Sequence, residues 1–116
     1  MFEVKASDYI QSGFSAEDAG KIAPIIKNAL KEHGAIKVNF KGISYYTTLF
    51  FSQSVTNLLG QMSKKEYDSK IKIANLTKSG KITYQHAMAY AVDFYSETEQ
   101  ERIKQEEMVN KTLKNI

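Results

Sequence analysis

The sequence predicts an α/β protein with a small, mostly parallel sheet of three or four strands and helices mainly on one face. Short segments with strand-like alternation are separated by longer segments with apolar residues at helical spacing, which is the order that βαβ units produce. Each strand-like segment alternates apolar and polar residues, whereas a parallel strand covered on both faces is continuously apolar. The chain has 116 residues, which is enough for a single modest core.

The three predicted strands are short. Their ranges are Met1–Ala6, Ala35–Lys41 and Lys70–Leu76. Because their apolar residues recur at every second position, one face of the sheet should carry the core and the other face should be polar. The residues expected on the polar face are Lys5, Lys37, Asn39, Lys41, Lys70 and Lys72.

The first helix is predicted from Ser15 to Gly34. Ser15 followed by Asp18 has the spacing of a capping box, an apolar stripe follows, and Gly34 is suited to end the helix. Pro24 lies inside the stripe and removes the hydrogen bond to Gly20. We therefore expect either a kinked helix or a short first turn followed by a second helix that starts at Pro24.

Two further helices are predicted after the second strand. One runs from about Thr48 along the apolar series Phe51, Val55, Leu58, Leu59 and Met62. Residues 63–69 are interpreted as a polar connector, and Thr77–Gly80 as a turn with a helix cap. The other helix runs from about Lys81 to Tyr95 through Ile82, Ala87, Tyr90, Ala91 and Phe94.

The chain is interpreted as one domain over residues 1–95 with a C-terminal segment over residues 96–116. The C-terminal segment is charged, contains no proline and has a weaker apolar series. It is therefore expected to be either a fourth, less apolar helix or a partly ordered tail.

Composition narrows the class of protein. There is no cysteine, no apolar run of the roughly 20 residues that a membrane span needs, and no signal peptide at the N-terminus. We therefore expect a cytoplasmic protein without a membrane partner. The net charge of +3 is too mild to favour nucleic-acid binding.

No set of residues indicates catalysis or metal binding. His33 and His86 are the only histidines, and neither has carboxylates at ligand spacing. Ser79–Lys81 lacks the glycine pattern of a phosphate-binding loop, so a helix cap is the preferred interpretation. The protein is expected not to be an enzyme and to use no cofactor or metal.

Three short motifs resemble those of STAS-like domains, which are distant relatives of bacterial anti-anti-sigma factors. They are Ala16–Gly20 at the start of the first helix, without the Arg common there, Val38–Ile43 at the end of the second strand, with Asn39 in place of an Asp, and Thr47–Phe50 at the bend into the second helix. The third strand, with Ile71–Asn75, completes the order. The resemblance covers about residues 13–95 and includes the predicted order of strands and helices.

The resemblance implies a regulatory role for the bend between the second strand and the second helix. Anti-anti-sigma factors carry an Asp and then a phosphorylatable Ser there, and this chain has Thr47 and Thr48 at those positions. Thr48 is thus a candidate phosphosite, although the missing Asp departs from the family pattern. The other interpretation is that Thr47 or Thr48 is simply the N-cap of the second helix.

The same bend is the candidate contact surface for a protein partner. Tyr45 and Tyr46 lie in a polar loop and are either half-buried lids over the core or recognition residues, since tyrosine provides a large contact area. The polar side of the second helix adjoins this loop. The predicted partner-binding residues are Tyr45, Tyr46, Thr47, Thr48, Ser52, Gln53 and Thr56, with Asn57 beside them.

Two functional hypotheses follow. The first is a non-catalytic, STAS-type interaction module whose partner, by resemblance, is a histidine-kinase-like ATPase or an anti-sigma-type factor. The second is a small basic inhibitor or adaptor, of a phage- or defence-associated kind, that uses a basic face against an acidic or nucleic-acid-containing partner. That face comprises Lys37, Lys41, Lys70 and Lys72.

The lysines also have two other interpretations. They can serve solubility and protect the strands from unwanted pairing, or the acidic C-terminal segment can fold back over them. The sequence leaves a homodimer open and does not identify the partner.

Overall fold

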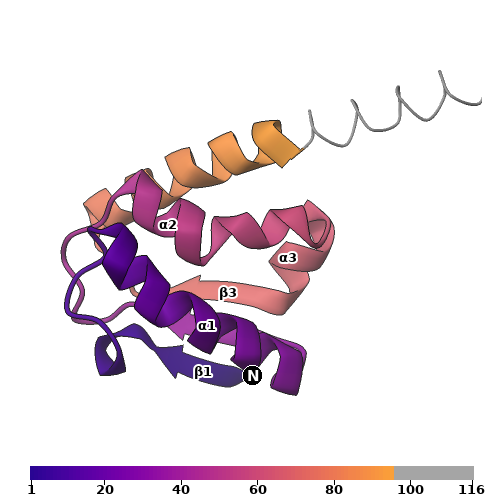
Figure 1. Ribbon diagram of the computed structural model, residues 1–116, viewed down its shortest axis with the longest axis horizontal. Helices are drawn as coiled ribbons and strands as arrows, with labels where there is room; N and C mark the ends of the chain where they lie inside the picture. Colours follow the sequence, from indigo (N-terminus) through magenta and orange to yellow (C-terminus); the bar gives the residue numbers. More distant parts are fainter. Residues whose placement is uncertain (96–116) are drawn as a thin grey trace, which may run out of the picture.

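The computed structural model describes residues 1–95, which form a three-stranded parallel sheet with helices along one face (Figure 1). The strands are β1 (Phe2–Lys5), β2 (Ile36–Asn39) and β3 (Ile71–Ala74), in the spatial order β1-β2-β3. The register aligns Val4 with Val38 and Val38 with Ile73. The predicted α/β class and the parallel pairing are therefore confirmed.

The two faces of the sheet differ as the alternation predicts. Val4, Ile36, Val38 and Ile71 are buried on the face that the helices cover. No helix within residues 1–95 covers the other face, which we call the uncovered face, and there Lys37 of β2 is aligned with Lys72 of β3. Two of the lysines assigned to this face lie elsewhere in the structure, because Lys41 follows β2 in a turn and Lys70 is the last residue of a helix.

The first helix, α1 (Ala16–His33), has the predicted ends. The Ser15 hydroxyl accepts a hydrogen bond from the Asp18 amide at 3.1 Å, and the Asp18 carboxylate accepts one from the Ser15 amide at 3.3 Å. Gly34 ends α1 with a φ of 76°, in the left-handed region that favours glycine. Since α1 continues through Pro24, the alternative of a second helix that starts there is wrong. A short 3₁₀ helix, η1 (Ala6–Asp8), joins β1 to the loop before α1.

The second helix is shorter than predicted. α2 (Thr48–Ser54) ends before Val55, whose φ of −126° and ψ of −57° are not helical, and the 3₁₀ helix η2 (Thr56–Gly60) follows. The side chains of Ser54 and Thr56 donate hydrogen bonds to the carbonyls of Phe50 and Phe51. Such bonds from hydroxyls to the backbone compete with regular helix formation. The apolar series predicted as one helix is therefore divided between α2 and η2.

Residues 63–69 do not form a connector, and this prediction is wrong. They belong mainly to α3 (Lys64–Lys70), which Ser63 caps by accepting a hydrogen bond from the Glu66 amide at 3.1 Å. Tyr67, the one large apolar residue of this segment, is buried and anchors α3 to the core. The remaining side chains of α3 are polar and face solvent, which is why the pattern was not recognised as a helix.

The last described element is helical from residue 78 to residue 95 and lies on the helical side of the molecule (Figure 1). Thr77 caps it by accepting a hydrogen bond from the Gly80 amide at 3.0 Å, so it begins three residues before the predicted start. Ala87 and Ala91 are buried, whereas Ile82, Tyr90 and Phe94 are exposed and lie outside the core. The predictions for residues 96–116, including a fold-back over the lysines, lie outside the described residues.

Candidate docking surface at the strand-to-helix elbow

A turn carries the chain from β2 to the start of α2. Gly42 has a φ of 89°, which an L side chain adopts only with strain. It follows Phe40 and precedes Ile43, both of which are buried. These two apolar anchors fix both ends of the turn on the core, so the segment 44–47 emerges in a defined direction. We refer to residues 42–48 as the elbow.

Thr47 is the N-cap of α2, as one of the two sequence interpretations requires. Its hydroxyl accepts a hydrogen bond from the Phe50 amide at 3.1 Å and donates one to the Phe14 carbonyl at 2.6 Å. Thr48 is the first residue of α2 and is partly exposed. The hydroxyl of Thr47 is therefore committed to local structure, although both threonines are partly exposed.

Tyr46 is a structural lid. Its ring stacks on Phe51 with centroids 5.3 Å apart, and its hydroxyl donates a hydrogen bond to the Ile43 carbonyl at 2.8 Å. A Cβ atom built on Gly13 would lie 2.8 Å from the ring, and one built on Gly80 would lie 2.7 Å from it. Two glycines thus make room for this ring. Burial raises the pKa of the Tyr46 phenol to about 12.

The loop before α1 is joined to the elbow by backbone hydrogen bonds. The Gly13 amide donates to the Tyr45 carbonyl at 2.8 Å, and the Thr47 amide donates to the Gly13 carbonyl at 2.9 Å. Gly13 and Tyr46 form a parallel β-bridge. Together with the bond from Thr47 to Phe14, these contacts hold two distant segments of the chain side by side.

Around this rigid frame, several side chains are open to solvent. Phe14 is 63% exposed, Tyr45 is 73% exposed and Leu49 is 49% exposed. The polar residues of the exposed side are Thr48, Ser52 and Gln53. We call these six residues the elbow patch: Phe14, Tyr45, Thr48, Leu49, Ser52 and Gln53.

Sequence reasoning missed Phe14 and Leu49. Leu49 precedes Phe51 by two positions, which at 100° per residue places it about 200° around the helix from the buried face. That offset indicates from the sequence alone that Leu49 lies on the exposed side of the helix. Phe14 precedes the helix cap Ser15, a position where an apolar side chain often packs against the first turn of the helix, so the sequence did not indicate its exposure.

Thr56 does not belong to the surface, and its placement there is wrong. Its side chain is 0% exposed, and its hydroxyl donates to the Phe51 carbonyl at 3.2 Å. Because α2 ends at Ser54, residue 56 is not at the angle that a continuous helix would give it. Asn57, in contrast, is exposed as predicted.

The lysines predicted as a basic face are only partly brought together. Lys37 and Lys72 are aligned on the uncovered face of the sheet. Lys70 forms an ion pair with Glu66 at 3.6 Å, and the Lys72 ammonium donates to the Asp68 carbonyl at 2.6 Å. α3 therefore engages two of the four lysines in local contacts.

Outside the elbow, the buried Tyr67 pairs with the partly buried Tyr84. The hydroxyls of Tyr67 and Tyr84 are 2.8 Å apart and hydrogen-bonded. Burial raises the pKa of both phenols, and for Tyr67 the charge and hydrogen bond of Tyr84 act in the same direction. The pair links α3 to the helix of residues 78–95. Within residues 1–95 there is no group of three or more potential metal ligands.

Comparison with known proteins gives one match. A family model described as a STAS-like domain of unknown function matches residues 18–81, which is more than half of the chain. Searches of curated proteins and of solved structures gave no match. In the part of the chain that the structure describes, no helix is both long and apolar enough to cross a membrane.

Proposed function

We propose, from the premise that this chain belongs to the family of STAS-like domains of unknown function, that it is a non-catalytic regulatory module. In this proposal it docks a protein partner through the elbow patch. By resemblance to anti-anti-sigma factors, the partner class is a histidine-kinase-like ATPase or an anti-sigma-type factor, and the setting is the cytoplasm.

The observation that carries this proposal is the exposure of Phe14, Tyr45 and Leu49 on two segments that the bridge between Gly13 and Tyr46 holds side by side. Large apolar side chains gathered at one place on a surface are typical of protein interaction sites. Tyrosine and other aromatic residues contribute most of the binding energy at many interfaces. The polar residues of the elbow patch adjoin this apolar group and suit the rim of an interface.

The rigidity of the elbow supports the same proposal. Gly42, the Thr47 cap and the bridge between Gly13 and Tyr46 fix the backbone that presents the exposed side chains. A surface that is ordered before binding loses less conformational entropy when a partner docks. The proposed surface therefore needs no rearrangement of the elbow to become competent for binding.

The test is co-purification of the full chain from cells of its native host, with identification of the bound proteins by mass spectrometry. We expect Tyr45→Ala combined with Leu49→Ala to reduce recovery of a specific partner at least tenfold, because both side chains are exposed and their loss leaves the core intact. Tyr46→Ala is not a suitable probe, since it would disturb the stack on Phe51. The matched variant Lys37→Glu with Lys72→Glu should leave recovery unchanged.

The second candidate function is a basic inhibitor or adaptor that uses the lysines against an acidic partner. The alignment of Lys37 with Lys72 on the uncovered face of the sheet favours it. Under this hypothesis the lysine variant loses the partner and the elbow variant retains it. Binding to phosphates would also weaken steeply as salt is added.

Phosphorylation of Thr48 is part of the proposal only as a means of regulation. The added charge would lie within the elbow patch and alter the docking surface. The intact mass of the protein isolated from its native host tests it, because a phosphate adds about 80 Da to the chain. Under the proposal, replacement of Thr48 by Val removes that additional mass.

A further inference from the structure

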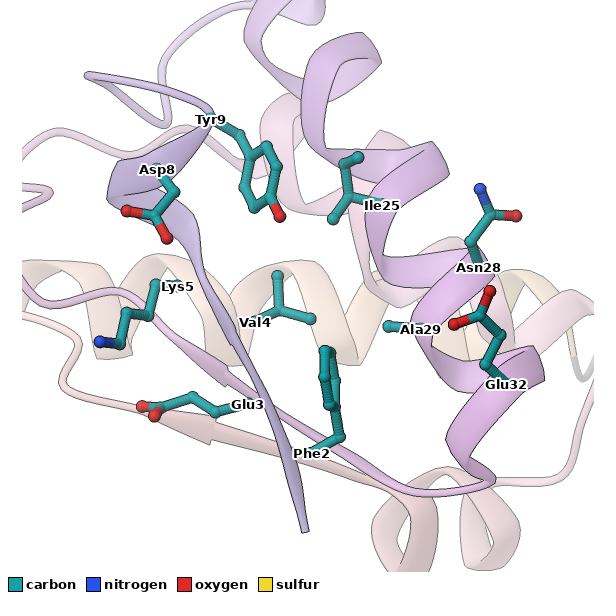
Figure 2. Close-up of a pocket in the computed structure, with 10 residues that line it drawn as sticks. All are labelled: Phe2, Glu3, Val4, Lys5, Asp8, Tyr9, Ile25, Asn28, Ala29 and Glu32. Carbon is teal, nitrogen blue, oxygen red and sulfur yellow. The ribbon is translucent and has the colours of Figure 1, made fainter.

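Within residues 1–95, β1 pairs only with β2, so its outer edge has no neighbouring strand in that part of the chain. Beside this outer edge, between β1 and α1, lies a groove of ≈ 390 Å³. Figure 2 shows Phe2 and Val4 on the side of β1 that faces α1, and Glu3 and Lys5 on the opposite side. Both apolar and charged side chains line this groove. An open strand edge with a groove beside it can accept a further strand.

The charges on this edge are arranged in a particular order. Glu3 and Lys5 are two residues apart and lie on the uncovered face of the sheet. The Glu3 carboxylate accepts a hydrogen bond from the Asn39 side chain at 2.6 Å, which holds it on that face. Lys5 is exposed and makes no ion pair within the described residues. One acid and one base thus flank Val4 symmetrically along the strand.

We propose that two copies of this chain associate through their β1 strands, paired antiparallel about a two-fold axis at Val4, so that the two sheets become one. In that register Val4 lies opposite Val4 of the second copy. Glu3 lies opposite Lys5 of the second copy, and Lys5 opposite its Glu3. Residues that are directly opposite in an antiparallel pair share a face and are close enough for their side chains to interact.

The charges select this register among those that symmetry allows. A two-fold axis perpendicular to the joined sheet keeps the helices of both copies on the same side. Such an axis must pass between one residue and the same residue of the second copy. If the axis passes through Glu3, two carboxylates are opposite each other, and if it passes through Lys5, two ammonium groups are. β3, the other edge of the sheet, has Lys72 and Ala74 on that face and offers no opposite-charge pair.

The apolar residues of the groove would be covered by the same association. Phe2 and Tyr9 are exposed, and both line the groove together with Ile25 of α1. Side chains of the incoming strand that face α1 would contact them. Because β1 has only four residues, the contact is smaller than that of a standard stable interface. We therefore expect a weak dimer, with a dissociation constant of about 10 μM to 1 mM.

The test is sedimentation equilibrium of the full chain over that range of concentration. In Lys5→Glu, and separately in Glu3→Lys, both opposite-charge pairs become like-charge pairs. We expect dimerisation of each single variant to be at least about tenfold weaker than that of the wild type. A mixture of the two variants should recover dimers, since every cross-strand pair in the heterodimer is again of opposite charge. Native mass spectrometry identifies that heterodimer by its mass.

The control is Lys72→Glu, which makes the same change of charge on the same face of the sheet but away from the β1 edge. It should dimerise like the wild type. The proposal is overturned if the wild type remains monomeric at 1 mM, if Lys5→Glu and Glu3→Lys dimerise as the wild type does, or if their mixture forms no heterodimer. The association uses no residue of the elbow patch, so these outcomes are independent of the docking proposal.

Discussion

At the scale of single residues, Tyr46 makes several different kinds of contact. It stacks on Phe51, reaches the Ile43 carbonyl, and fits against Gly13 and Gly80. The adjacent Tyr45 is exposed. Two neighbouring tyrosines therefore have different environments: Tyr46 is packed into the elbow and Tyr45 is open to solvent. The sequence interpretation left a half-buried lid and a recognition residue open for both.

The buried phenols predict how stability changes at alkaline pH. The folded-state pKa of Tyr46 is about 12, above its ordinary value of 10.0, and the pKa values of Tyr67 and Tyr84 are shifted in the same direction. The unfolded chain therefore loses these protons first. The stability that depends on the neutral phenols is complete below about pH 10 and is lost as the pH rises toward 12.

We accordingly expect the urea midpoint of the wild type to fall steeply between pH 10 and pH 12. Tyr46→Phe removes one of the titrating groups. At pH 8 this variant should be less stable by about 1 kcal/mol, because one hydrogen bond is lost, and its urea midpoint should be lower. Over the alkaline range its midpoint should fall less than that of the wild type. If the two proteins showed the same alkaline slope, Tyr46 would not be buried as described.

At the scale of elements, the close approach between the loop before α1 and the elbow is a specific structural requirement. A Cβ atom on Gly13 would lie 2.8 Å from the Tyr46 ring and 3.1 Å from the Tyr45 carbonyl oxygen. We expect Gly13→Ala to lower the free energy of unfolding by about 1–3 kcal/mol, because the backbone must move to remove the overlap. Urea denaturation followed by circular dichroism measures this.

Gly20 is the matched control for that substitution. It lies within α1, and a Cβ atom built on it has no atom within 4 Å. Gly20→Ala should raise the stability by about 0.5–1 kcal/mol, because alanine favours the helix over the unfolded chain. Equal effects at the two glycines would contradict the described packing of Gly13 against the elbow.

The helix α3 allows a separate prediction. The Ser63 hydroxyl caps it, and Ser63→Ala should lower stability by about 1 kcal/mol. Ser52→Ala, on the exposed side of α2, should change stability by less than about 0.5 kcal/mol. Thermal unfolding of both variants provides the comparison. A Ser63 variant as stable as the wild type would mean that the cap contributes nothing.

These elements also show where the sequence was informative. The ends of α1 were predicted because Ser15, Asp18 and Gly34 have local roles that neighbouring residues alone determine. α3 was missed because its apolar content is mainly one residue, Tyr67, although the spacing of Ser63 and Glu66 was a cap signal. The end of α2 was missed because side chain to backbone bonds at Ser54 and Thr56 depend on burial.

At the scale of the whole molecule, strand order and pairing followed from the alternation of strands and helices, and the two-sided sheet followed from alternation within the strands. The elbow patch was only partly predictable. Tyr45, Thr48, Ser52 and Gln53 were identified, but Phe14 joins them only through the bridge between Gly13 and Tyr46. The sequence around Phe14 does not indicate that the Phe14 carbonyl accepts a hydrogen bond from Thr47, which lies 33 residues further along the chain.

The fold separates two surfaces that can be tested independently. The elbow patch lies where the chain enters α2, and the β1 edge lies along the outer strand of the sheet. A weak dimer through β1 would place two elbow patches in one assembly without using their residues. A bivalent assembly of this kind would strengthen attachment to a partner that itself carries two binding sites.

Site-specific photo-crosslinking in cells of the native host tests the docking claim most directly. A photoreactive phenylalanine analogue would replace Tyr45 in one protein and Lys72 in another, both at exposed positions. The elbow proposal predicts a discrete crosslinked protein from position 45 and none from position 72. A crosslink from position 72 alone would contradict the proposal and assign partner binding to the uncovered face of the sheet.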